Sequence, residues 1–204
     1  WRTPRPRRAA LAVVLTLTAC DRGQGTVTSA SSSDLVKDVH ILAPAIDIPL
    51  PAFELVDHEG KPFTRDGMLG AVWVTGFIFT SCPTGCPGLT RKLSALAQEH
   101  EAEADVRFLT LTIDPENDTP EKLAAFASKH GTLRPSWKLV TGKPEVVDQT
   151  VLKGFVTPFA RGASPAEFTH SERFVVVDKR GHVRGVFDSD EAGQLMAAVN
   201  HMLG

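Results

Sequence analysis

The spacing of apolar residues changes sharply about one third of the way along the chain. Residues 71–79 are β-branched or aromatic and nearly uncharged, a pattern that predicts a strand buried on both faces of a sheet. After Pro87 the apolar residues Leu89, Leu93 and Leu96 follow a helical spacing, with polar residues between them. The short segment between these patterns therefore lies at a strand-to-helix junction.

The rest of the chain alternates in the same way. The expected strands are residues 53–56, 61–63, 106–113, 137–140, 174–177 and 182–187, and the first two form a hairpin around a turn at residues 57–60. Three further helices are expected. The first has Asp118 or Thr119 as its N-cap and ends at His130, the second spans residues 143–153, and the last begins at residues 188–190. Residues 154–168 show no period and predict an irregular loop, and a loop of this length is usually functional.

Composition and charge narrow the class of protein. The 204 residues are 42% hydrophobic and 23% charged, as expected of one globular domain with a substantial core. The net charge of −2 hides an asymmetry, because four of the 22 basic residues are arginines within the first eight positions. The remainder has 18 basic against 24 acidic residues, so we expect no nucleic-acid partner.

The N-terminal residues resemble an export signal. The early arginines precede a short apolar run at residues 9–19, which ends at Cys20. The segment Leu17-Thr18-Ala19-Cys20 resembles the lipobox of bacterial lipoproteins, and the resemblance implies lipidation of Cys20; an ordinary cleaved signal or an uncleaved anchor is the alternative. We therefore expect a signal peptide at residues 1–19, a lipidated cysteine with a flexible linker at 20–45 and a folded domain at 46–204. The domain would face the periplasm from the inner membrane of a bacterial cell envelope, an oxidising compartment.

Cys82 and Cys86 are the candidate reactive residues. They follow the first core strand and precede a helix, whose N-terminus favours a thiolate over a thiol. Three interpretations follow: a structural disulfide, a redox dithiol or two ligands of a soft metal. A disulfide across so short a loop would constrain the unfolded chain little, which favours the other two.

The order of elements resembles the thioredoxin-like fold, an α/β fold with a central mixed sheet flanked by helices, here with an N-terminal β-hairpin. In that fold the first strand of the terminal hairpin runs antiparallel to the strand that carries the cysteines. The resemblance therefore places His170 beside Cys82 and Cys86, and puts His182 at the opposite end of the sheet.

Three motifs together resemble the Sco/SenC family of membrane-anchored copper proteins that act in cytochrome c oxidase assembly. They are the segments FTSCPTGCP at residues 79–87, IDPENDTP at 113–120, and His170-Ser171. The resemblance implies that Cys82, Cys86 and His170 bind copper, and that the second motif shapes the neighbouring loop, with Asp114 and Asp118 in structural roles. The spacer residues Thr84 and Gly85 differ from the Asp-Val of mitochondrial members, which bears on the choice of partner.

The ligand chemistry agrees with that implication. Two thiolates and an imidazole suit Cu(I) and can also hold Cu(II), whereas a structural zinc site normally needs four protein ligands. The resemblance implies a metallochaperone for the binuclear copper centre of cytochrome c oxidase. Its partners would be the copper-receiving oxidase subunit, a thioredoxin-like reductant and other periplasmic copper chaperones.

Other functions use the same residues. A thiol-disulfide reductase would need Cys82 and Cys86 as its redox dithiol but not His170, and it would keep the oxidase cysteines reduced. A copper or redox sensor would share the whole site, and a peroxidase is indicated by the scaffold alone. Whether the chain is an enzyme is therefore open at this point.

Overall fold

The computed structural model describes residues 46–164 and 167–204. The expected signal peptide, Cys20 and the linker up to residue 45 lie outside the described residues, and so they remain predictions. Within the described part of the chain, no helix combines the length and the apolar character needed to cross a bilayer.

The centre of the structure is a mixed, curled sheet of eight strands in the order β1-β10-β9-β4-β5-β6-β2-β3. The strands are β1 (Ile48–Pro49), β2 (Glu54–Asp57), β3 (Pro62–Thr64), β4 (Val72–Ile78), β5 (Val106–Thr112), β6 (Trp137–Thr141), β9 (Arg173–Val177) and β10 (His182–Asp188). The expected hairpin of β2 and β3 is confirmed, and it joins the sheet through antiparallel pairing of β2 with β6.

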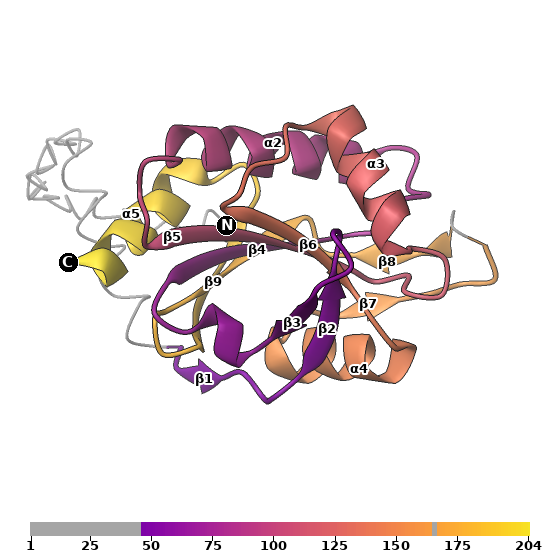
Figure 1. Ribbon diagram of the computed structural model, residues 1–204, viewed down its shortest axis with the longest axis horizontal. Helices are drawn as coiled ribbons and strands as arrows, with labels where there is room; N and C mark the ends of the chain where they lie inside the picture. Colours follow the sequence, from indigo (N-terminus) through magenta and orange to yellow (C-terminus); the bar gives the residue numbers. More distant parts are fainter. Residues whose placement is uncertain (1–45, 165–166) are drawn as a thin grey trace, which may run out of the picture. The chain divides into compact units, whose positions relative to one another are not determined.

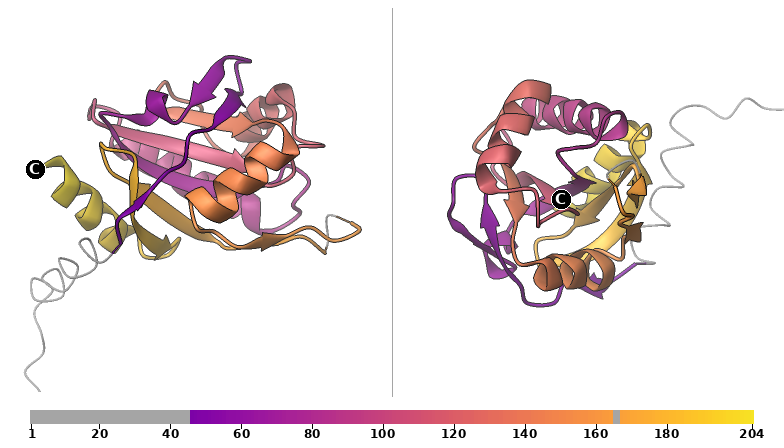
Figure 2. Two further views of the ribbon diagram at one scale, coloured as in Figure 1. Left: turned by 90° about the horizontal axis from the view of Figure 1, so that it is seen from below. Right: turned by 90° about the vertical axis from the view of Figure 1, so that its right-hand side faces the viewer.

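Helices cover both faces of this sheet. They are α2 (Gly85–Glu99), α3 (Pro120–His130), α4 (Pro144–Gln149) and α5 (Ala192–Leu203), with a 3-10 turn η1 (Asp66–Met68) and a π-helical turn η2 (Thr150–Gly154). Figures 1 and 2 show α2, α3 and α5 on one side of the sheet and α4 on the other. The thioredoxin-like α/β fold expected from the sequence is confirmed.

Strand β4 lies at the centre of the core and leads to the cysteines. All seven of its residues are buried, as its uniformly apolar sequence predicts. It pairs in parallel with β5 along its whole length and antiparallel with β9, from Trp73 opposite Val177 to Thr75 opposite Val175. The start of β9 therefore lies at the same end of the sheet as the end of β4, as the sequence predicts.

Some elements differ from their expected form. The helix expected at residues 143–153 is α4 followed by the π-helical turn η2, and the last helix begins at Ala192 instead of residues 188–190. The segment 154–168 is not wholly irregular. It contains β7 (Phe159–Ala160), which pairs with β8 (Thr169–His170) as a two-stranded ribbon beside the main sheet. Strands of two residues show no detectable period, which is why the sequence did not reveal them.

Candidate metal centre

A buried carboxylate holds the segment that enters the cysteine loop. Asp118 accepts hydrogen bonds from the backbone N–H of Thr80 at 3.0 Å and from the hydroxyl groups of Thr80 and Thr112. The Asp118 side chain is fully buried, and burial raises the pKa of its carboxyl group against the lowering effect of these donors. The N-cap of α3 is Thr119, whose hydroxyl accepts from the Lys122 N–H, so the alternative of Asp118 as N-cap is wrong.

Cys82 lies at the N-terminus of α2, with its Sγ atom 3.4 Å from the backbone nitrogen of Cys86. Burial alone would raise the pKa of the Cys82 thiol, but N–H groups of Cys86, Thr84 and Gly85 and the Cys86 thiol donate toward the sulfur. The net result is a pKa below the ordinary value of a cysteine. Because the side chain is only partly buried, other molecules can reach Cys82, which forms a thiolate more readily than an ordinary cysteine.

Cys86 has the opposite environment, although it lies only one helical turn away. Its side chain is fully buried in the first turn of α2, and burial raises the pKa of its thiol, with a further increase from the neighbouring Cys82. The two cysteines are free and not joined by a disulfide. The pair therefore combines one accessible thiol that ionises readily with one buried thiol that keeps its proton until a metal ion displaces it.

His170 completes the cluster from β8. Its Nε2 atom lies 3.2 Å from the Sγ atom of Cys86, and its Nδ1 atom lies 3.1 Å from the backbone carbonyl of Ser171. A carbonyl oxygen can only accept, so Nδ1 carries the proton and Nε2 keeps a lone pair that faces the sulfur atoms. Burial lowers the pKa of His170, which keeps the ring neutral and able to bind a metal.

Aromatic rings fix the plane of this imidazole. The Phe79 ring meets the His170 ring edge-to-face, with centroids 5.7 Å apart, and the Phe168 ring packs against Phe79 at 5.1 Å. Phe79 is the last residue before the cysteine loop, so the same strand end places the thiols and orients the histidine.

An arginine ties the ribbon that carries His170 to the body of the domain. Arg161 follows β7 directly, and its guanidinium pairs with Asp148 of α4, donates to the carbonyl oxygen of Ile113, and lies 4.8 Å above the Phe159 ring. Phe159 is in turn the residue opposite His170 in the ribbon. The position of the imidazole therefore depends on contacts made by a segment that the sequence predicted to be irregular.

The three side chains fit a single soft metal ion. The ligand atoms of Cys82, Cys86 and His170 all lie within 4.8 Å of one another. Sulfur and nitrogen atoms that each lie about 2.0–2.3 Å from one ion are at most ~4.6 Å apart, so only a small adjustment is needed. In the described residues this is the cluster of histidine, cysteine and acidic side chains that converges closely enough to bind a metal.

The sequence placed these three residues correctly relative to one another. His170 lies at the cysteines, whereas His182 lies at the far end of β10, where it contacts Asp47. Asp114 is a turn residue, as expected, because its backbone carbonyl and carboxylate accept from Asn117. The sequence did not show the bonds of Asp118 to the cysteine loop or the packing of Phe79 and Phe168, since both depend on tertiary contacts.

The fold and the site together define a thioredoxin-like protein whose dithiol has a neutral imidazole beside it. A sequence profile described as SCO1/SenC matches residues 47–203, and the chain therefore belongs to the SCO1/SenC family. It is 31% identical to the SCO1 protein homolog of Bacillus subtilis over 133 residues, which cover 64% of this chain and 69% of that protein. It is 27% identical over 156 residues to a putative copper-binding protein of Stutzerimonas stutzeri, with 74% of each chain covered.

Solved structures agree with this assignment. A SCO1/SenC family lipoprotein from Bacillus anthracis superimposes with a TM-score of 0.71 at 26% identity and covers 77% of this chain and 96% of its own. BsSco, described as a member of the Sco family of cytochrome c oxidase assembly proteins with a disulfide switch, gives a TM-score of 0.63 at 27% identity, covering 74% and 94%. The match spans about two thirds of the curated relatives, with 69% of the Bacillus subtilis protein and 64% of a SCO2-like protein of Rickettsia prowazekii.

Proposed function

We propose that this protein is a copper metallochaperone that binds one copper ion through Cys82, Cys86 and His170. The observation that carries the proposal is the convergence of two sulfur atoms and one imidazole nitrogen within 4.8 Å. Anchoring through a lipidated Cys20 on the periplasmic side of the inner membrane belongs to the same proposal. It rests on the sequence alone.

The donor set supports copper over the ions that compete with it. Two thiolates and a neutral imidazole form a soft set that suits Cu(I) and can also hold Cu(II), whereas magnesium and calcium prefer oxygen ligands. A structural zinc site would need a fourth protein ligand, and the cluster has three. The relative from Stutzerimonas stutzeri is described as a putative copper-binding protein, which supports the same metal.

The proposed client is the subunit of cytochrome c oxidase that carries the binuclear copper centre. The description of BsSco as a member of a family of cytochrome c oxidase assembly proteins supports this class of client. Delivery would proceed by ligand exchange, in which each thiolate of the client forms a bond to Cu(I) as a bond to Cys82, Cys86 or His170 breaks. No electrons move in this exchange, and the protons of the client thiols pass to the released ligands or to solvent.

The first test is an anaerobic titration of the reduced 204-residue chain with Cu(I) against a competing chelator. We expect one tight equivalent of copper. His170→Ala and Cys86→Ser should each weaken binding by more than about 100-fold, because even residues that only orient a ligand contribute 10–100-fold.

His182→Ala is the matched control, since it removes a histidine at the opposite end of the sheet. It should leave copper affinity unchanged. Loss of affinity in His182→Ala equal to that in His170→Ala, or no tight binding by the unaltered chain, would overturn the metallochaperone proposal.

A thiol-disulfide reductase is the second candidate, and the contrast between the two thiols favours it. Cys82 has a lowered pKa and is partly exposed, whereas Cys86 has a raised pKa and is buried, as in a dithiol with one attacking and one resolving thiol. In the reductase reaction the Cys82 thiolate attacks the disulfide of an oxidised client, and Cys86 then displaces the client thiol to leave Cys82–Cys86 as a disulfide. A thioredoxin-like reductant would have to restore the dithiol.

His170→Ala separates the two functions. A reductase should reduce an oxidised peptide at an unchanged rate in this variant, whereas copper affinity should fall by more than about 100-fold. Both activities can belong to one protein, because the thiols must be reduced before they bind copper. A sensor of copper or redox state would use the same site and would differ in having a signalling partner.

A further inference from the structure

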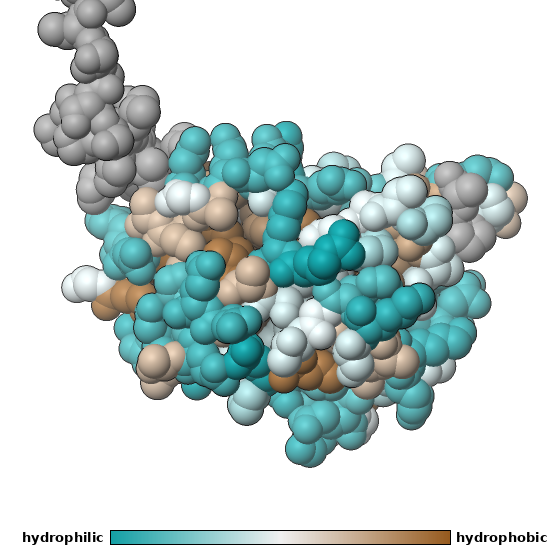
Figure 3. Space-filling model, turned by 90° about the horizontal axis from the view of Figure 1, so that it is seen from above, coloured by the Kyte–Doolittle hydropathy of each residue, from teal (hydrophilic) through white to brown (hydrophobic). Residues whose placement is uncertain are grey.

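A groove opens beside Cys82, between the N-terminal end of α2 and helix α3. Its volume is about 410 Å³, and its lining residues are Thr80, Cys82, Pro83, Pro87, Lys122, Ala125, Phe126, Lys129 and His130. Figure 1 shows α2 and α3 side by side at this place, and Figure 3 shows the face of the molecule onto which both helices project. The groove therefore begins at the accessible thiol and runs along a helix that has no part in the metal cluster.

The charged residues that line this groove are all positive. Lys122 and Lys129 line it, and none of its lining residues is acidic. Glu121, the acid in the first turn of α3, is exposed and does not line the groove. Two other grooves on the domain differ in this respect, since one includes Glu54 and Asp66 and another includes Asp178.

The two lysines are free to meet an external anion. The Nζ atom of Lys122 donates to the backbone carbonyl oxygen of Asn117 at 2.7 Å, and a carbonyl does not neutralise its charge. Within the described residues no ion pair joins Lys122 or Lys129 to a carboxylate, and both side chains are exposed. Elsewhere on the domain lysines do form such pairs, as Lys138 does with Glu59 and Lys179 with Asp105.

The groove reaches only one of the three ligands. Cys82 lines it, whereas the buried Cys86 and its neighbour His170 are not among the lining residues. The side of the groove near Cys82 is formed by Pro83 and Pro87, and Ala125 and Phe126 add apolar surface from α3. An extended chain lying in the groove would thus contact apolar surface, two lysines and the accessible thiol at once.

We propose that this groove is the docking site for a partner protein and that it binds an extended, acidic segment next to the partner's metal-binding cysteines. The inference rests on the proposed function, because it names the chemistry of the client that receives copper. Charge complementarity selects the segment. Lys122 and Lys129 pair with its acidic residues, and the apolar wall near Cys82 accommodates the stretch that carries the cysteines.

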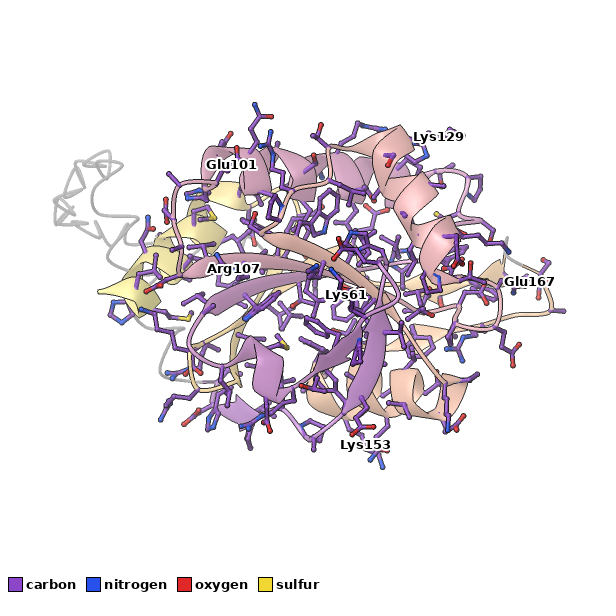
Figure 4. All side chains as sticks on the ribbon, viewed as in Figure 1. Lys61, Glu101, Arg107, Lys129, Lys153 and Glu167 are labelled. Atoms are coloured by element: carbon purple, nitrogen blue, oxygen red, sulfur yellow. The ribbon has the colours of Figure 1, made fainter. Side chains whose placement is uncertain are left out.

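The test compares charge reversals at the groove and away from it. The double variant Lys122→Glu/Lys129→Glu leaves the three metal ligands in place. Lys153→Glu is the control, since Lys153 is an exposed lysine on the opposite side of the sheet, as the labels in Figure 4 show for Lys129 and Lys153. The probe is a synthetic peptide with two cysteines flanked by aspartate and glutamate, together with a peptide in which lysine replaces the acids and one in which serine replaces the cysteines.

We expect the acidic peptide to bind the reduced 204-residue chain with a dissociation constant that rises about tenfold in the double variant and less than about twofold in Lys153→Glu. The lysine peptide should bind the unaltered chain weakly and the double variant more tightly. Equal binding of acidic and lysine peptides, or an equal loss in Lys153→Glu, would overturn the proposal. Displacement of the acidic peptide by a few millimolar inorganic phosphate would also overturn it, since the groove would then be a site for small anions.

The serine peptide separates this inference from the proposed function. Its binding depends on the lysines and requires neither copper nor thiol exchange. If the chain binds no copper but still prefers the acidic serine peptide in a lysine-dependent way, the docking site stands and the metallochaperone function fails. If the chain binds copper tightly and the charge reversals leave binding of every peptide unchanged, the docking site fails and the metallochaperone function stands.

Discussion

The carboxylate of Asp118 accepts two hydrogen bonds from Thr80, a residue 38 positions earlier in the chain. One bond comes from the backbone N–H and the other from the hydroxyl group, so both the backbone and the side chain of Thr80 are held by this carboxylate. These bonds join the entry to the cysteine loop to the start of α3, so the position of Cys82 depends on a residue outside the metal cluster.

Asp118→Asn tests this coupling. The amide of asparagine has only one acceptor oxygen for donors that the carboxylate serves with two, so one buried hydroxyl or N–H loses its partner. We expect a loss of about 1–3 kcal/mol in the free energy of unfolding and a decrease in Cu(I) affinity of about tenfold. Chemical denaturation and the chelator titration measure the two effects. Glu116→Gln on the same loop is the control, because Glu116 is exposed and should give neither effect.

The affinity for Cu(I) should rise with pH. The pKa of Cys86 is raised by burial, so this thiol is protonated in the metal-free protein and must release its proton when copper binds. Each unit of pH therefore increases the apparent affinity about tenfold while Cys86 is the only protonated ligand. Copper binding displaces a second proton, from His170, only in acidic solution, because burial lowers the pKa of His170 below the usual value of about 6.5. Titrations between about pH 6 and 9 would show this rise in affinity, and a flat profile would contradict the raised pKa of Cys86.

The two thiols should differ in reactivity. The lowered pKa of Cys82 increases its thiolate fraction at neutral pH, and its partial exposure admits a reagent. Limited treatment of the reduced chain with iodoacetamide at pH 7 should therefore modify Cys82 well before Cys86, with peptide mass spectrometry as the readout. Equal modification of both cysteines in the folded protein would show that Cys86 is not protected as the structure indicates.

Arg161→Gln should loosen the ribbon that carries His170. The substitution removes the ion pair with Asp148 and the charged hydrogen bond to the Ile113 carbonyl, at a cost of about 1–2 kcal/mol. We expect faster proteolysis within residues 154–168 and a weaker effect on copper affinity than that of His170→Ala. Arg173→Gln is a suitable control, because its ion pair with Asp188 is exposed and lies outside this segment.

Copper should slow that proteolysis if the ribbon responds to the metal. Copper bound at His170 would hold β8 against the cysteine loop. Because β8 pairs with β7, the residues between these two strands would also be held more firmly. Equal cleavage rates with and without copper would show that the ribbon is already fixed in the metal-free protein.

The strongest sequence signals are the ones that the structure confirms. Strand β4 and helix α2 follow long, uninterrupted patterns, and their junction at Cys82 and Cys86 was evident from the change of period alone. The choice of His170 over His182 followed from the antiparallel direction of β9 relative to β4, a relation that the fold imposes. That these residues bind copper remains a prediction.

The features that the sequence did not reveal depend on contacts between distant segments. An aspartate before Thr119-Pro120 has the pattern of an N-cap, and only the tertiary structure shows that its carboxylate is bonded to Thr80 instead. Likewise, the lysines of α3 have the spacing of an ordinary solvated helix face. Their position beside Cys82 follows from the packing of α3 against α2, which no local pattern encodes.

The dithiol and the imidazole belong to different parts of the architecture. Cys82 and Cys86 sit at the junction of the central sheet with α2, whereas His170 comes from the two-stranded ribbon of β7 and β8 beside that sheet. The third ligand therefore reaches the site from outside the main sheet, on a segment whose Phe159 and Phe168 pack against the core. A change at position 170 alone would remove the imidazole and leave both cysteines in place on the central sheet and α2. The same modularity makes the ribbon the natural segment to exchange when a metal-binding scaffold is engineered from a redox protein, or the reverse.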